Sequence, residues 1–132
     1  MSLDANKALV RQYFQELTNE GKLDVALEIL SPEAVVPVQQ LITMLHTAFP
    51  DFHVTIEDQL AEGDKVVTRF TARGTHQGVW RSPLGSIEPT GKAFEHEGMR
   101  IFRIADRRLV ETLGGADTLR QLQQLGIVPI TL

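Results

Sequence analysis

Hydrophobic residues recur every third or fourth position along the first part of the chain, up to about position 50. This spacing predicts helices over residues 4–19, 23–30 and 38–49, with Asp4 as the N-cap of the first helix. A serine–proline pair ends the second helix, because proline disfavours helical geometry in the residue before it. The residues expected to be buried on the second and third helices are Leu23, Leu27, Leu30, Leu41, Ile42, Leu45 and Phe49.

The period of the pattern changes to two after position 51, where apolar and polar residues begin to alternate. Alternation predicts strands over residues 52–60, 65–76, 93–104 and 108–113. Between the second and third of these strands, residues 77–92 are rich in glycine and proline, which predicts a long loop without regular structure. Such loops often carry ligand contacts.

The order of these elements predicts the fold class. Helices come first, antiparallel strands follow, and one short helix over residues 118–125 comes last. This segregated order is typical of an α+β fold. No linker or repeat divides the sequence, so we expect a single domain over residues 1–132. A curved sheet wrapped around helices would leave a pocket between the two layers.

Composition narrows the chemistry that this domain can perform. The chain has no cysteine, which excludes disulfides, thiolate metal sites and cysteine nucleophiles and favours a cytoplasmic location. The 13 Lys and Arg against 17 Asp and Glu argue against nucleic acid as a partner. No apolar stretch approaches the length of a membrane-spanning helix. No metal-binding spacing and no phosphate-binding loop is found, so we expect no metal and no cofactor.

Several short motifs follow one another along the chain. They are LVRQYF at residues 9–14, AFPD at 48–51, EGDKVV at 62–67, RGTHQG at 73–78, PTGK at 89–92, IFRI at 101–104 and QLQQLG at 121–126. In this order they resemble the SnoaL-like polyketide cyclases, also called the ester cyclase family. That family belongs to the nuclear-transport-factor-two-like superfamily of cone-shaped α+β folds. The resemblance extends over nearly the whole chain.

The resemblance implies a structure and an activity. It implies a curved antiparallel sheet around the N-terminal helices, an apolar pocket for a small molecule, and homodimers that pack through the outer sheet face. It also implies acid–base chemistry without a cofactor. In the cyclases, a carboxylate removes a proton from carbon, and the resulting enolate closes a ring by aldol addition.

Two residues are candidates for the catalytic groups. Asp117 follows the fourth strand, where the family places acidic residues near the pocket, and it could be the base. The N-cap of the last helix is the competing role, and it is the one that the sequence favours. His96 shares a strand face with Phe94, Arg100 and Phe102 by alternation. It relays a proton if that face lines the pocket, and it is a surface residue if the face points outward.

The expected substrate-binding residues are aromatic or polar. Tyr13 lies on the first helix, where core packing competes with the oxyanion-binding role that the related ketosteroid isomerases give to a tyrosine at a similar place. Trp80 covers the pocket or fills a subunit interface, and His76 hydrogen-bonds either a ligand or the backbone. The predicted substrate-binding set is Tyr13, Phe70, His76, Trp80, Arg100 and Phe102.

Two departures from the family leave alternatives open. Residues 34–40 replace a longer segment that carries His or Asp, and Gly114 and Gly115 stand where relatives have a Trp and an acidic residue. Asp117 or Glu111 therefore supplies the base, or the cyclase chemistry has been lost. The first hypothesis is a cyclase or isomerase acting on an apolar carbonyl compound. The second is a non-catalytic binding or dimerising domain, and the third is a steroid-type isomerase or dehydratase that uses Tyr13.

Overall fold

The chain begins with one long helical segment whose winding changes part-way. The computed structural model describes residues 2–82 and 84–128. Helix α1 (Leu3–Gln12) continues directly into a π-helical segment, η1 (Tyr13–Asn19). In η1 the Thr18 hydroxyl donates to the Tyr13 carbonyl oxygen at 2.9 Å. The predicted helix over residues 4–19 is thus confirmed in extent, while the π winding of its second half was not foreseen.

The next two helices differ from the prediction at their ends. Helix α2 (Val25–Ile29) is shorter than expected, and α3 (Pro32–Ala48) begins six residues early. Proline is tolerated at the first helical position, and Pro37 removes only one backbone hydrogen bond. Two residues expected to be buried are exposed: Leu27 to 59% and Leu41 to 41%. Among the described residues, no helix is long and apolar enough to cross a membrane.

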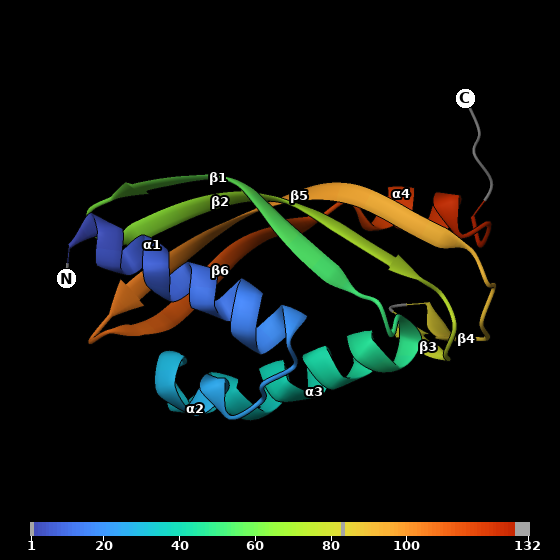
Figure 1. Ribbon diagram of the computed structural model, residues 1–132, viewed down its shortest axis with the longest axis horizontal. Helices are drawn as coiled ribbons and strands as arrows, with labels where there is room; N and C mark the ends of the chain where they lie inside the picture. The colour runs from blue at the N-terminus through green and yellow to red at the C-terminus, as the bar shows by residue number, and fades with distance from the viewer. Residues whose placement is uncertain (1, 83, 129–132) are drawn as a thin grey trace.

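The four long strands form one curved antiparallel sheet. Its strands are β1 (His53–Glu62), β2 (Lys65–Thr75), β5 (Ala93–Ala105) and β6 (Arg108–Ala116), in the order β1-β2-β5-β6. Figure 1 shows the sheet arching over α1, α2 and α3, which all lie on its inner side. The α+β class and the arrangement of a curved sheet over N-terminal helices are therefore confirmed.

The strands follow the predicted alternation with two exceptions. Strand β1 carries a bulge between Ile56 and Asp58, so the side chains after it change faces and Leu60 is exposed. Strand β6 continues to Ala116, three residues beyond the predicted end, and α4 (Thr118–Gln124) follows it. A bulge inserts one unpaired residue, which a pattern of period two does not reveal.

Residues 77–92 are more regular than the sequence suggests. They contain a small hairpin of β3 (Trp80–Ser82) and β4 (Gly85–Ile87). The backbone N–H groups of Gln77 and Gly78 donate to the Ala48 carbonyl oxygen at the end of α3. This contact fixes the hairpin beside α3, where Trp80 packs on Phe49 with ring centres 5.3 Å apart.

Candidate active site

A cavity lies between the inner face of the sheet and the helices beneath it. Its volume is about 630 Å³, and residues of η1, α3, β1, β2, β3, β5, β6 and α4 line it. The largest part of its wall is apolar. The aromatic and aliphatic side chains that form this wall include Phe14, Ile42, Phe52, Val54, Phe70 and Trp80.

The polar groups of the cavity are few, and the described residues that line it include no Asp or Glu. The titratable or charged side chains are Tyr13, Arg81, His96 and Arg100. A proton acceptor in this cavity must therefore be an imidazole, because the phenol and the guanidinium groups are protonated at neutral pH.

His96 lies on the inner face of β5, opposite Ala72 of β2. Its side chain is 5% exposed and stacks on Phe94, with ring centres 5.2 Å apart. Burial lowers the pKa of His96 below the usual histidine value, although the neighbouring Gln121 and Asp117 oppose the shift. The Nδ1 atom has no hydrogen-bond partner among the described residues. His96 is therefore a neutral imidazole at pH 7 and can accept a proton.

Tyr13 and Arg100 line the same cavity as His96. Burial raises the pKa of the Tyr13 phenol, and the positive charge of Arg100 opposes this shift only in part. The hydroxyl thus keeps its proton and can donate a hydrogen bond. Arg100 lies on β5 between Thr68 of β2 and Gly114 of β6. The pair combines a hydrogen-bond donor with a nearby positive charge, which is what an oxyanion requires.

The sequence matches the model of a known protein family. The model of the family described as SnoaL-like polyketide cyclase matches residues 8–125. The chain belongs to the SnoaL-like polyketide cyclase family. No curated protein matches the sequence.

Solved structures of similar shape agree with this assignment. TsrD from Streptomyces laurentii is 25% identical, with 97% of this chain and 99% of that chain covered and a TM-score of 0.86. IdmH from Streptomyces antibioticus, a candidate polyketide cyclase, is 28% identical over 92% of this chain and 98% of its own, with a TM-score of 0.73. AclR from Streptomyces galilaeus, a candidate hydroxylase, shares the fold at 24% identity, 99% and 87% coverage and a TM-score of 0.82.

In this SnoaL-like chain, Asp117 does not line the cavity. Its carboxylate accepts a hydrogen bond from the Arg120 N–H at 3.0 Å, as the N-cap of α4. It is exposed and lines a neighbouring groove with Glu95 and Glu97, and this groove shares His96 with the cavity. Glu111 is also exposed and forms an ion pair with Arg103 at 3.5 Å. Neither of the two carboxylates expected from the sequence to act as the base is among the described residues that line the cavity, and Asp117 caps α4 instead.

His76 and Phe102 also lie outside the cavity wall. His76 is fully buried, and its Nδ1 accepts a hydrogen bond from the Thr90 N–H at 3.2 Å. Phe102 packs beneath Tyr13, with ring centres 5.4 Å apart. Phe102 thus packs against Tyr13 of the cavity wall, and the His76 ring lies beside that of Trp80, with ring centres 6.2 Å apart. Tyr13, Phe70, Trp80, His96 and Arg100, by contrast, all line the cavity.

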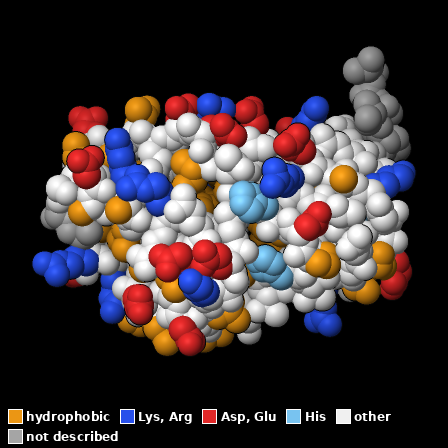
Figure 2. All heavy atoms as spheres, viewed as in Figure 1, with side chains coloured by type: hydrophobic (Ala, Val, Ile, Leu, Met, Phe, Trp, Pro, Cys, Tyr) orange, Lys and Arg blue, Asp and Glu red, His pale blue; other side chains and the backbone are white. Residues whose placement is uncertain are grey.

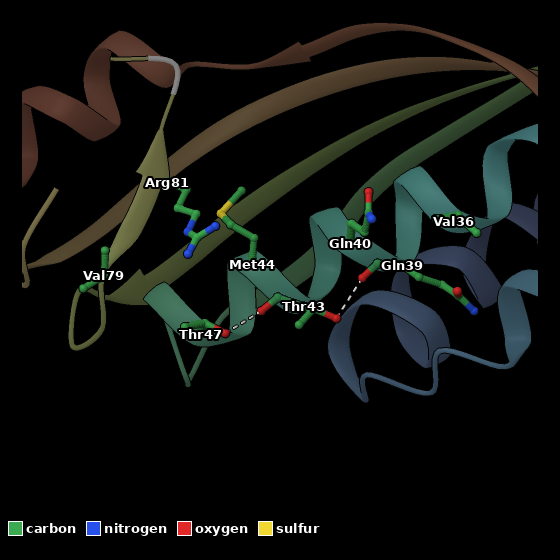
Figure 3. A pocket seen from close by; sticks show the side chains of 8 residues that line it. All are labelled: Val36, Gln39, Gln40, Thr43, Met44, Thr47, Val79 and Arg81. Atoms are coloured by element: carbon green, nitrogen blue, oxygen red, sulfur yellow. Dashed lines mark hydrogen bonds between the residues drawn. The ribbon is translucent and has the colours of Figure 1, made fainter. Parts of the chain in front are cut away.

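A second hollow adjoins the cavity. It has a volume of about 400 Å³ and lies between α3 and β3, as Figure 3 shows. Met44 and Arg81 line both spaces, so they stand at the boundary between them. The sequence analysis missed Arg81, because three alternating residues within a glycine- and proline-rich segment are too short a signal for a strand.

The site contains no evident metal centre in the part of the chain that the structure describes. No group of three or more His, Asp or Glu side chains lies close enough together there to hold a metal ion. The chemistry available in the cavity is that of an imidazole, a phenol and two guanidinium groups.

Proposed function

We propose that this protein removes a proton from the carbon beside a carbonyl group of a small apolar compound. Ring closure by aldol addition, or isomerisation, follows without a cofactor. The observation that carries this proposal is the position of His96, a buried imidazole with a lowered pKa, in an apolar cavity that also contains Tyr13. Membership of the SnoaL-like polyketide cyclase family supports the same class of chemistry.

The steps follow from the groups in the cavity. His96 accepts the proton as the C–H bond breaks, and the electron pair of that bond moves into an enolate. The Tyr13 hydroxyl donates to the enolate oxygen, and Arg100 adds positive charge nearby. The enolate carbon then attacks a second carbonyl carbon and forms a C–C bond. The imidazolium of His96 returns the proton to the new alkoxide, so the base is regenerated.

Asp117 acts on this reaction from outside the cavity. Its negative charge raises the pKa of His96, against the larger effect of burial. In this proposal Asp117 is a positioning residue that tunes His96, and His96 is the base. The roles that the sequence suggested for these two residues are therefore exchanged.

The experiment that tests the proposal is exchange of α-hydrogens for deuterium. The probe is 2-tetralone, an apolar ketone, followed by proton NMR in D2O with the protein in catalytic amounts. We expect exchange above the buffer rate, and a loss of about 10²-fold or more in the His96→Gln variant. The matched control is His53→Gln on β1, which removes an imidazole away from the cavity. Equal exchange rates for wild type and His96→Gln would reject the proposal.

A second candidate function is binding without catalysis. The specific observation in its favour is that no described residue of the cavity wall carries a carboxylate. Such a protein would bind 2-tetralone and would leave its exchange rate at the buffer value. Binding without exchange would therefore favour this candidate over the enzyme.

The isomerase or dehydratase alternative gains support from one residue. It requires the Tyr13 side chain to reach the cavity, and Tyr13 is part of the cavity wall. Under this alternative the Tyr13→Phe variant loses turnover of an unsaturated ketone as completely as His96→Gln does. Under the main proposal it loses less, because Arg100 remains.

The outer sheet face supports an assembly of two copies. Leu60, Val67, Ile101 and Leu113 are direct cross-strand neighbours, so they form one apolar row across all four strands. Three of them are exposed and Val67 is half-buried. We propose that this outer row packs against its counterpart in a homodimer, since contiguous apolar surface of this kind marks an interaction site.

A further inference from the structure

The charge of the cavity differs from that of the whole chain. The chain carries a formal net charge of −4, yet the described residues that line the cavity include two arginines and no Asp or Glu. Within the described residues, ion pairs are formed by Lys22, Arg69 and Arg103, and neither Arg81 nor Arg100 forms one. The half-buried guanidinium of Arg100 is unfavourable in a mostly apolar wall unless an anion accompanies it, whereas the exposed guanidinium of Arg81 can receive an anion from water.

The two arginines occupy different depths. Arg100 is half-buried on β5, close enough to Tyr13 for its charge to act on the phenol. Arg81 is exposed on β3 at the boundary between the cavity and the adjoining hollow. Figure 3 shows its side chain extending toward Met44 of α3. One guanidinium thus accompanies the reacting carbonyl group, and the other stands at the opening.

The enolate of the proposed reaction supplies a negative charge to only one of these two arginines. The negative charge that develops during proton removal lies on the carbonyl oxygen, beside Tyr13 and Arg100. Arg81 is then left with no anion from the reaction. A substrate that carries a permanent negative charge at its outer end would supply one, and that end would also stay in contact with water.

We infer that the substrate is an apolar carboxylic acid, bound with its carbonyl-bearing body inside the cavity and its carboxylate on Arg81 at the opening. This inference rests on the proposed function for the orientation of the substrate. The planar guanidinium of arginine matches the two oxygens of a carboxylate. The apolar wall takes the body of the acid, and the hollow between α3 and β3 leaves room for entry.

The test compares two probes that differ only in charge. 2-Naphthylacetate and 2-naphthylacetamide are titrated into the full chain at pH 7.5, and their dissociation constants are measured by isothermal calorimetry. We expect the acid to bind about threefold to tenfold more tightly than the amide. We also expect this preference to shrink as salt is added, because the contact is partly exposed.

Two sets of variants locate the preference. Arg81→Gln should remove the preference for the acid over the amide. Arg100→Gln should retain most of this preference and slow the exchange of 2-tetralone. Met44→Glu should also remove the preference for the acid, because the new carboxylate can pair with Arg81. The matched neutral variant Met44→Gln should keep the preference. Both Met44 variants are similar in size, so a difference between them reports charge.

The outcomes separate this inference from the proposed function. If the acid binds no more tightly than the amide, or if neither probe binds, the inference falls, and the exchange of uncharged 2-tetralone still decides the function. If the preference survives Arg81→Gln unchanged, the inference also falls. If the preference is present and depends on Arg81 while no exchange occurs, the protein binds acids without catalysis and the proposed function fails instead.

Discussion

Two buried histidines differ in what surrounds them. His96 and His76 are both buried, and burial lowers the pKa of each. His96 lies in the cavity wall and has an unpartnered Nδ1, so its neutral ring is available for chemistry. His76 accepts a hydrogen bond from the Thr90 N–H, so its neutral ring holds the chain before β5 in place. The same residue type thus faces the cavity in one place and holds the backbone in the other.

His76 provides a prediction at this scale. The His76→Phe variant keeps an aromatic ring against Phe49 and leaves the Thr90 N–H without an acceptor. We expect the free energy of unfolding to fall by about 1–3 kcal/mol. The measurement is urea denaturation followed by circular dichroism, with His53→Phe as the control on a more exposed strand position.

The pH dependence of the free energy of unfolding is a second test of the role of His76. The pKa of His76 is lowered in the folded state, so the unfolded chain binds more protons as the pH drops below about 6.5. Stability should therefore fall with pH in that range, and less steeply in His76→Phe. An identical pH dependence for wild type and variant would show that His76 does not contribute to it.

At the scale of elements, the sequence predicts the order and type of the main helices and strands but not their irregular parts. The spacing of apolar residues locates the first helical segment and the four long strands. The helical spacing and the alternation of strands both arise because one face of each element is buried. The π winding of η1 is different, because the spacing of apolar residues does not distinguish it from an α-helix. Tyr13, Phe14 and Thr18 of η1 line the cavity.

The candidate site was predictable to a similar extent. Alternation places His96 and Arg100 on one face of β5, and the structure shows that this is the inner face. Asp117 could not be decided in the same way, because capping and catalysis require the same residue type at the same place. The position of Arg81 at the cavity depends on how the β3–β4 hairpin packs on α3. That packing is a tertiary contact, and the local sequence gives no signal for it.

The docking of the hairpin is testable through Gly78. A side chain at this position would overlap the carbonyl oxygen of Thr47 in α3, so the backbone of the hairpin could not approach the helix. We expect Gly78→Ala to lower the free energy of unfolding by about 1–3 kcal/mol. Chemical denaturation measures this loss.

The control for Gly78 lies on β6. A Cβ atom at Gly115 would meet no atom within 4 Å, so Gly115→Ala should be close to neutral. Gly78→Ala should also weaken binding of 2-tetralone, because Trp80 and Arg81 follow it in the cavity wall. Equal stability of the two variants would contradict the role given to this contact.

At the scale of the whole molecule, charged side chains of both signs are dispersed over the surface, and one apolar row crosses the outer face of the sheet between them. Figure 2 shows Lys and Arg side chains interspersed with Asp and Glu on the face that it presents. The outer row of the sheet, by contrast, is apolar from β1 to β6. We expect this outer row to determine the oligomeric state.

Ile101 tests that expectation, because it lies between Val67 and Leu113 in the outer row. The Ile101→Lys variant should be monomeric by light scattering after size exclusion, where the wild type should be dimeric. Burying a lysine in a two-fold contact places two like charges close together. Leu27→Lys on α2, which is exposed to 59% against 39% for Ile101 and lies away from the outer face of the sheet, should remain dimeric. A monomeric wild type, or a dimeric Ile101→Lys, would contradict the proposed homodimer.

We propose that His96 is the base and that Asp117 only raises the pKa of His96. The measurement that tests this most directly is the pH profile of 2-tetralone exchange in wild type and Asp117→Asn. Asparagine also caps helices well, so the fold is kept. In wild type the rate should rise with pH through a midpoint below about 6.5, because the neutral form of His96 is the base.

In Asp117→Asn we expect exchange to persist within a few-fold of the wild-type rate, with the midpoint moved to lower pH. The shift is downward because the variant removes a negative charge that favours the protonated imidazole. Loss of exchange in a folded Asp117→Asn protein, at every pH, would make Asp117 the base and contradict the account.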